Sequence, residues 1–211
     1  MKSKKTKMSA SSVLGAVITK ENKKAKGKGK AGKSGGMFES VVLALKGLGF
    51  KFYKHSTFEG MAADKLPKRY IVGGVPYDSL LKQKAEEYGI PRKRGTPKTE
   101  FVIVAEDAKT TEQFPVNGEP LKVRIECKWQ AVAGTTQSKL LFSVVDLQYG
   151  APEENIILLM DGNGFDEAMH AFIQEVCEDG LTWDRAPKVK PKIIRKMRLQ
   201  EFITWCNEAF A

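Results

Sequence analysis

A ten-residue stretch near the middle of the chain alternates strictly between apolar and polar residues. This stretch, residues 121–130, reads Leu-Lys-Val-Arg-Ile-Glu-Cys-Lys-Trp-Gln. A period of two is typical of a β-strand with one face against the core, because successive side chains point to opposite faces. On the polar face, Glu126 and Lys128 are neighbours. A carboxylate can bind a hard cation, and an ammonium beside it can hold water. The pattern also fits a strand with a solvated polar face, so a metal site requires further carboxylates.

Two glutamates on other predicted elements could join Glu126. Glu39 lies in the first turn of a helix that we predict from apolar residues at helical spacing between residues 38 and 48. A glutamate in a first turn is also favoured by the helix dipole alone. Glu100 stands at the start of the apolar run Phe101-Val102-Ile103-Val104. We expect residues 100–130 to form an extended antiparallel hairpin, which could bring Glu100 next to Glu126.

The other elements predict an α/β fold. We expect strands at residues 50–55 and 155–160, and helices at 135–149, 166–179 and 199–210. The strand–helix–strand run between residues 121 and 160 predicts a parallel crossover. The expected fold is therefore a mixed central sheet of about four strands flanked by helices. We interpret residues 58–98 as a less regular insertion with one helix, and residues 185–198 as a basic connector to the C-terminal helix.

The net charge of +10 resides at one end of the chain. Residues 1–35 hold eleven Lys and one acid, so 11 − 1 = +10, while the remainder has 24 basic and 24 acidic residues. We predict a disordered Lys-rich tail over residues 1–35 and one domain over 36–211. Such a tail would attract a polyanion through counterion release, although a solubilising tail or contact with acidic proteins would have the same composition.

Cysteine usage and hydropathy indicate the compartment. The three cysteines are widely spaced within apolar patterns, which predicts reduced core residues rather than disulfides or a zinc site. No stretch approaches the length and apolarity of a membrane span. We therefore expect a cytoplasmic protein without a membrane partner.

The order of the predicted elements resembles the PD-(D/E)XK nuclease superfamily, which has the restriction-endonuclease-like fold. The resemblance covers about residues 35–180 and rests on Ile-Glu-Cys-Lys-Trp-Gln at residues 125–130 and Ile-Ile-Leu-Leu-Met-Asp-Gly at 156–162. These segments look like members encoded by bacteriophages and bacteria. The first helix is similar to the opening of archaeal Holliday-junction resolvases.

The resemblance implies catalytic roles for four residues. Glu100 would be the first motif acid, Glu126 the second, Lys128 the motif lysine and Gln130 a residue often found two positions later. The chain has Thr-Glu at residues 99–100 where the family pattern has Pro-Asp. The neighbouring acids Glu106 and Asp107 are therefore alternatives for the first motif acid.

The resemblance also implies the cofactor. The expected cation is Mg²⁺, with Mn²⁺ as a substitute. Its ligands would be Glu39, Glu100, Glu126 and the main-chain carbonyl of Cys127.

The expected activity is hydrolysis of nucleic-acid phosphodiester bonds, with DNA as the expected substrate and a homodimer as a further expectation. The candidate nucleic-acid-binding residues are Lys68, Arg69, Arg92, Lys93, Arg94 and Lys98. The alternative is a non-catalytic nucleic-acid-binding or accessory protein that uses its tail, with Glu126 and Lys128 as a surface ion pair. A nucleotide-processing enzyme is disfavoured because no Gly-rich phosphate loop follows a predicted strand.

Overall fold

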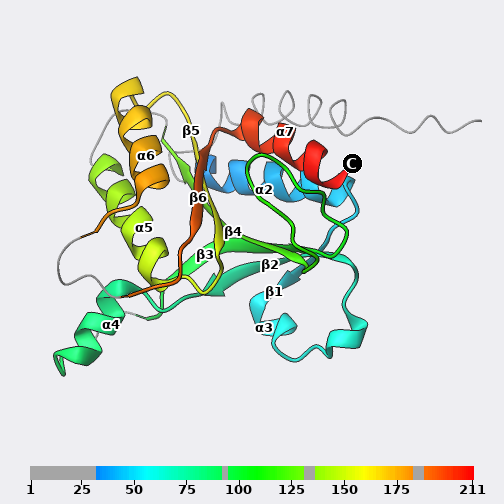
Figure 1. Ribbon diagram of the computed structural model, residues 1–211, viewed down its shortest axis with the longest axis horizontal. Helices are drawn as coiled ribbons and strands as arrows, with labels where there is room; N and C mark the ends of the chain where they lie inside the picture. Colours follow the sequence, from blue (N-terminus) through cyan, green and yellow to red (C-terminus); the bar gives the residue numbers. More distant parts are fainter. Residues whose placement is uncertain (1–31, 92–94, 131–135, 183–187) are drawn as a thin grey trace, which may run out of the picture.

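The computed structural model describes residues 32–91, 95–130, 136–182 and 188–211, with side chains from Ser40 onward in the first helix and from Leu140 onward in α5. Helices and strands follow one another along the chain (Figure 1). The helices are α2 (Gly32–Gly47), α3 (His55–Phe58), α4 (Leu80–Glu87), α5 (Thr136–Gly150), α6 (Glu167–Asp179) and α7 (Leu199–Phe210), with a 3₁₀ turn at Ala63–Lys65. The strands are β1 (Lys51–Lys54), β2 (Arg69–Pro76), β3 (Lys98–Ala105), β4 (Leu121–Trp129), β5 (Asn155–Asp161) and β6 (Ile193–Met197).

The described strands form one mixed sheet in the order β1-β2-β3-β4-β5-β6. Strand β1 pairs in parallel with β2, and β2, β3 and β4 pair antiparallel. Strands β4, β5 and β6 are parallel neighbours. The predicted antiparallel hairpin is confirmed as β3 and β4, and the predicted parallel pairing is confirmed as β4 and β5.

The prediction of about four strands was wrong, because the sheet has six. Strand β2 lies within the predicted insertion, and β6 lies within the predicted basic connector. The sequence of β2 includes two glycines and a proline, and that of β6 includes two adjacent cations. These residues are poor β-formers, which hid both strands from a propensity argument.

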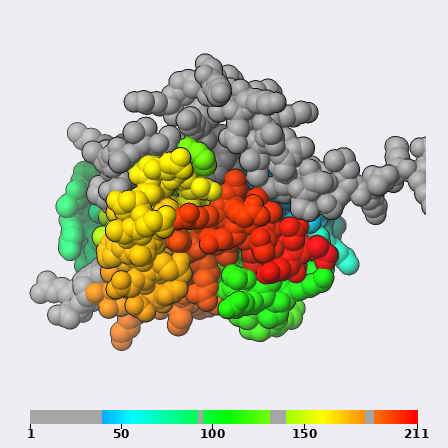
Figure 2. Space-filling model, turned by 90° about the horizontal axis from the view of Figure 1, so that it is seen from above, coloured from blue at the N-terminus to red at the C-terminus, as the bar shows by residue number. Residues whose placement is uncertain are grey.

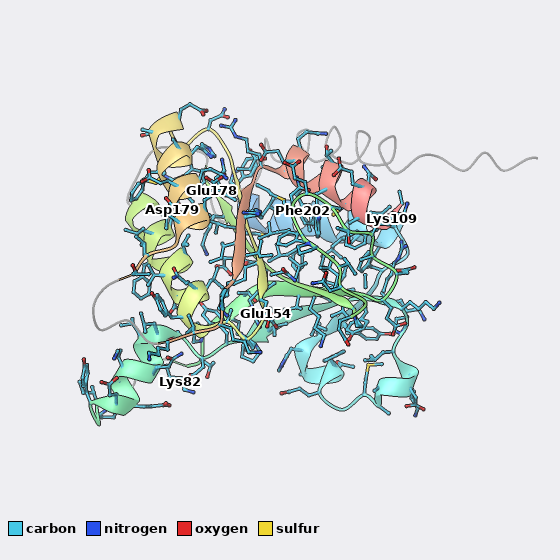
Figure 3. The ribbon with its side chains drawn as sticks, viewed as in Figure 1. Lys82, Lys109, Glu154, Glu178, Asp179 and Phe202 are labelled. Atoms are coloured by element: carbon cyan, nitrogen blue, oxygen red, sulfur yellow. The ribbon has the colours of Figure 1, made fainter. Side chains whose placement is uncertain are left out.

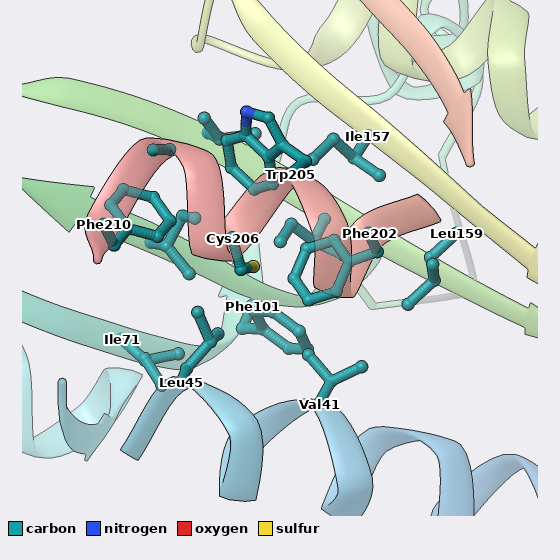
Figure 4. Close-up of a cluster of buried hydrophobic side chains, with 14 of the residues drawn as sticks. Val41, Leu45, Ile71, Phe101, Ile157, Leu159, Phe202, Trp205, Cys206 and Phe210 are labelled. Carbon is teal, nitrogen blue, oxygen red and sulfur yellow. The ribbon is translucent and has the colours of Figure 1, made fainter. Parts of the chain in front are cut away.

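Helices cover both faces of the sheet. On one face, α2 and α7 enclose a core that includes Val41, Leu45, Phe101, Ile125 and Trp205 (Figure 4). On the other face, α5 and α6 enclose a second core with β5. Its members include Leu140, Val144, Leu158, Met160 and Ile173. This three-layer arrangement buries the apolar face of each helix against the sheet. It agrees with a restriction-endonuclease-like α/β fold.

Strand β4 is covered on both faces. Its apolar side chains, such as Ile125 and Cys127, belong to the core with α2 and α7. On its other face, Arg124 is 0% exposed and Glu126 only 8%. The alternative of a solvated polar face is therefore wrong: β4 lies inside the sheet between β3 and β5, and Arg124 and Glu126 on this face are buried.

Two further expectations concern cysteines and membranes. Cys127, Cys177 and Cys206 are free and buried, as predicted. Of the helices in the described ranges, none is long and apolar enough to cross a membrane. The predicted tail lies outside the described residues up to residue 31, and the first described helix begins at Gly32.

Candidate active site

Strands β3 and β4 bring Glu100 and Glu126 together. Phe101 pairs with Ile125 in the antiparallel register, so Glu100 and Glu126 are the next opposed positions. The backbone N–H of Cys127 donates a hydrogen bond to Glu100 Oε2 at 2.9 Å. Residues directly opposite in such a ladder have side chains on the same face. The two predicted acids thus share one face of the sheet.

Glu126 is a buried acid with one oxygen available. The Lys128 ammonium donates a hydrogen bond to Glu126 Oε1. Burial raises the pKa of Glu126 to about 8; the Lys128 charge opposes this shift and the neighbouring Glu100 carboxylate adds to it. Glu126 Oε2 is buried and has no hydrogen-bond partner among the residues that the structure describes. A cation beside this oxygen would relieve the cost of burying the charge.

Lys128 remains charged in this environment. Its side chain is 23% exposed. Burial lowers the pKa of Lys128, but the charge of Glu126, its hydrogen bond and the charge of Glu100 outweigh burial, so the pKa lies above its usual value. Without a cation at the site, Lys128 is therefore a hydrogen-bond donor.

The donor set fits a hard divalent cation. Two carboxylates lie side by side on β3 and β4, and Glu126 has a buried oxygen that no donor of the described residues reaches. The Cys127 main chain, next to Glu126 on β4, donates its N–H to Glu100. No group of three or more Asp, Glu, His or Cys ligands occurs within the described residues. This is compatible with Mg²⁺, which is often bound by one or two protein carboxylates together with waters and phosphates.

The predicted ligand Glu39 lies outside the described side chains. Its helix, α2, packs through Val41 and Leu45 on the face of β4 that carries Ile125. Glu126 is on the opposite face, so a side chain from α2 would have to approach around the end of the strand. The proposed role of Glu39 stays a prediction.

The end of β4 is held by a glycine turn that follows β5. Gln130 donates its backbone N–H to Asp161 O at 3.1 Å and accepts from Gly164 N at 2.8 Å. The Asp161 carboxylate accepts from Gly162 N at 2.7 Å and from Leu199 N at 3.1 Å. Gly162 has φ +106°, and a Cβ there would lie 2.2 Å from Gln130 O. Only glycine fits this close approach. The predicted catalytic residue Gln130 is thus fixed in place through its main chain.

A buried ionic network lies beside Glu126 on the same face of the sheet. Arg124 pairs with Glu153 and donates to Thr99 Oγ1 at 2.7 Å and Val75 O at 3.1 Å. The Arg124 guanidinium also lies 5.6 Å from the centre of the Tyr77 ring. It therefore connects β4 with the ends of β2 and β3 and with the segment before β5.

Tyr77 extends this network to α5. Its hydroxyl donates to Asp146 Oδ2 at 3.0 Å. Burial, followed by the charge of Asp146 and a smaller contribution from Glu126, raises the pKa of Tyr77 above its usual range. These residues were not predicted from the sequence, although Arg124 among the polar residues of an alternating strand was a visible signal.

The predicted nucleic-acid-binding residues lie in different places. Lys98 is exposed at the start of β3, two residues before Glu100. Lys68 is exposed at the opposite end of β3, where its carbonyl accepts from Glu106 N. Arg69 binds Asp107 and the carbonyls of Leu48 and Phe210. The structure thus places Lys98 near Glu100 and uses Arg69 for contacts within the fold. The alternative first acids, Glu106 and Asp107, follow the other end of β3 and lie far from Glu126. Arg92, Lys93 and Arg94 lie outside the described residues.

A groove of about 750 Å³ lies elsewhere on the surface. It runs between α6, β6 and α7, which lie next to one another in the view from above (Figure 2). Arg195, Thr204 and Glu178 are among its lining residues, and it contains none of the predicted catalytic residues. It is therefore separate from the site on β3 and β4.

A known family matches most of the chain. The family described as a PD-(D/E)XK nuclease superfamily domain matches residues 30–210. Neither the curated proteins nor the solved structures gave a match. The matched range includes every described helix and strand.

Proposed function

The chain belongs to the PD-(D/E)XK nuclease superfamily, and from this and the geometry of its site we propose that it is a metal-dependent nuclease acting on DNA. The observation that carries the proposal is the opposition of Glu100 and Glu126 on paired strands, with Lys128 hydrogen-bonded to Glu126. Two acids and a lysine on one rigid face supply what phosphodiester hydrolysis requires of a protein.

The carboxylates would hold the cation. Glu100, Glu126 and the carbonyl of Cys127 are the proposed ligands, with Glu39 as a further proposed ligand. Mg²⁺ is the expected ion and Mn²⁺ its substitute. When bound, a divalent cation supplies Lewis-acid stabilisation of charge on the phosphate and the leaving oxygen.

Lys128 and Gln130 would orient the reactants. Since the pKa of Lys128 is raised by Glu126, its ammonium would donate hydrogen bonds to the attacking water or to a phosphate oxygen. Gln130, two residues further along the same face, would hydrogen-bond the same groups. The glycine turn at residues 161–164 would keep both residues in place through the end of β4.

Binding would also use basic residues outside the site. Lys98, two residues from Glu100, would contact a backbone phosphate. The Lys-rich N-terminal segment would add affinity that does not depend on sequence and that falls with salt. Two copies paired as a homodimer would allow both strands of a duplex to be cut. The expected compartment is the cytoplasm.

A substrate panel tests the proposal. Labelled duplex, single strand, flap, four-way junction and RNA are incubated with the purified protein and Mg²⁺. We expect cleavage of a DNA substrate, its loss in EDTA, and a decrease of roughly 10²–10⁴-fold in Lys128→Ala. Lys122→Ala is the matched control, because Lys122 is an exposed lysine on the same face of β4.

Intact substrates in every reaction would reject the proposal. Binding of nucleic acid without cleavage, in Mg²⁺ and in Mn²⁺, would instead support the non-catalytic alternative. A circular dichroism spectrum like that of the wild type would show that Lys128→Ala is folded and that its loss of activity is not caused by unfolding.

A further inference from the structure

The two carboxylates of the candidate site are closed off on the side of β5. Glu126 pairs with Leu158 of β5, and Lys128 pairs with Met160. Both of these partners are 0% exposed and belong to the core that α5 and α6 cover. A nucleic-acid strand therefore has no path to the carboxylates across β5.

On the other side of the carboxylates, the residue next to Glu100 is a glycine of β2. Gly73 pairs with Phe101, so Gly74 lies opposite Glu100. A Cβ at Gly74 would have no atom of the described residues, apart from its chain neighbours, within 4 Å. Helix α4, which follows β2, extends away from the body of the protein, and Lys82 on it is labelled in Figure 3 (see also Figure 1). Within the described part of the chain, Glu100 is therefore open toward β2.

Two physical reasons could require a glycine at position 74. Gly74 has φ +70°, which favours glycine, although asparagine also adopts this conformation. A glycine within a strand also marks places where a ligand approaches the backbone closely. Gly118, at φ +84°, has the same open surroundings but lies in the loop before β4, away from the site. Asparagine at these two positions therefore separates backbone conformation from substrate approach.

The exposed charged residues that pair with β2 next to Gly74 are lysines. Lys54, at the end of β1, lies opposite Gly73, and Lys98, at the start of β3, lies opposite the end of β2. Both lysines are exposed. The acid in this part of the register is Glu100, whose charge a bound divalent cation would offset. The described residues around Gly74 thus favour a phosphate backbone.

We propose that the substrate strand approaches the cation across Gly74, and that position 74 is a glycine because the sugar–phosphate backbone takes the place of a side chain there. The inference rests on the proposed function, which places a nucleic-acid strand at Glu100. It adds the direction from which the strand arrives, over β2 rather than over β5. Gly74 thus sets how closely the substrate backbone approaches the carboxylates.

Substitution by asparagine tests the inference. Gly74→Asn keeps the backbone conformation accessible and fills the open space beside Glu100. The Kd for a labelled DNA duplex, measured by fluorescence anisotropy in the Lys128→Ala background with Mn²⁺, should rise at least about tenfold. Gly118→Asn makes the same change away from the site and should bind the duplex as the parent does. The affinity for Mn²⁺, measured by isothermal titration, should be unchanged in both variants.

Cleavage provides a second measurement. With Lys128 retained, Gly74→Asn should lower kcat/KM by about 10²-fold, because a displaced phosphate no longer lies against the cation. Gly74→Ala, which adds only a methyl group, should show a smaller loss of the same kind. If circular dichroism shows that Gly74→Asn is unfolded, Gly74→Ala and Gly118→Ala take the place of the asparagine pair.

Salt dependence separates the steric effect from charge. Lys98→Ala should reduce the slope of log affinity against log salt by about one unit, whereas Gly74→Asn removes no cation and should leave the slope unchanged. Equal duplex binding by Gly74→Asn, Gly118→Asn and their parent would overturn the inference. So would a loss of Mn²⁺ binding in Gly74→Asn alone, because the glycine would then support the carboxylates instead of leaving room for the substrate.

The two proposals fail in different ways. Cleavage by the wild-type protein with no effect of Gly74→Asn on DNA binding would refute the approach across β2 and retain the nuclease. Weakened DNA binding by Gly74→Asn in a protein that cleaves nothing would refute the nuclease and retain this part of β2 as a binding surface.

Discussion

Glu126 is in a position that costs stability. It is buried, it faces a second carboxylate, and its pKa is raised to about 8 by burial above all. An acid held in this way destabilises a protein that has no cation to compensate for it. A structural role would be served better by a neutral side chain.

The pH dependence of stability tests this description. In the unfolded chain the Glu126 carboxyl has a pKa near 4.5. Between pH 4.5 and about 8, this carboxyl is therefore ionised in the unfolded state and protonated in the folded state. Stability of the metal-free protein therefore falls as pH rises through this window. Glu126→Gln has no carboxyl to ionise and should not lose stability in this way. Relative to the wild type, its free energy of unfolding should rise with pH, by roughly 4 kcal/mol at pH 8.

Urea unfolding at several pH values measures the difference. Glu112→Gln, a change at an exposed acid, is the control and should follow the wild type. Parallel pH profiles for the wild type and Glu126→Gln would show that Glu126 is not a strained acid.

Arg124, unlike Glu126, is a buried charge whose hydrogen bonds and ion pair are all supplied by the fold. Its partner Glu153 has a side chain that is 13% exposed, and Arg124 itself is fully buried. Breaking a buried pair leaves an uncompensated charge, so Arg124→Ala should lower the free energy of unfolding by about 3–5 kcal/mol. Lys190→Ala, which breaks an exposed pair with Glu154, should lower it by less than about 1 kcal/mol. Chemical denaturation compares the two, and equal losses would contradict this account.

Elements with a strong hydrophobic period were predicted well. Helix α5, helix α6 and strand β5 begin and end within about two residues of the expected positions, because their apolar residues face a core. Strand β2 was missed for a tertiary reason: at Gly73 a Cβ would lie 2.6 Å from Phe52 Cζ, so the Phe52 ring on β1 occupies the space of a side chain there. Strand β6 was missed because it is a short edge strand with charged residues, and a single sequence does not reveal its neighbour β5.

The glycine turn after β5 provides a test at the level of elements. Gly162→Ala introduces both backbone strain at φ +106° and a clash with Gln130 O. Gly118→Ala introduces strain at φ +84° with open space around the Cβ. Gly118→Ala should lose about 1–2 kcal/mol of stability, and Gly162→Ala should lose more because of its clash with the backbone. Only Gly162→Ala should also weaken Mn²⁺ binding, because it displaces the end of β4.

Calorimetric titration with Mn²⁺ compares these two glycine variants at a temperature where both are folded. Equal Mn²⁺ affinity in the two would mean that the turn supports the fold without positioning the site.

At the scale of the whole molecule, the acids and the lysine were predictable and their surroundings were not. Glu126 and Lys128 lie in one strand, and Glu100 is placed opposite by a hairpin, so local patterns sufficed. Arg124 and its partner Glu153, by contrast, are 29 residues apart. Their contact follows from the pairing of β4 and β5, but the further bond of Arg124 to Val75 O requires β2, which was not predicted from the sequence.

The central claim is that Glu100 and Glu126 share a divalent cation. Isothermal titration of the wild type, Glu100→Gln, Glu126→Gln and Glu106→Gln with Mn²⁺ tests it directly. The structure puts Glu106 at the far end of β3, so this variant should bind as the wild type does, while each of the other two should lose at least about tenfold in affinity. Wild-type Mn²⁺ affinity in Glu100→Gln and Glu126→Gln would contradict the claim.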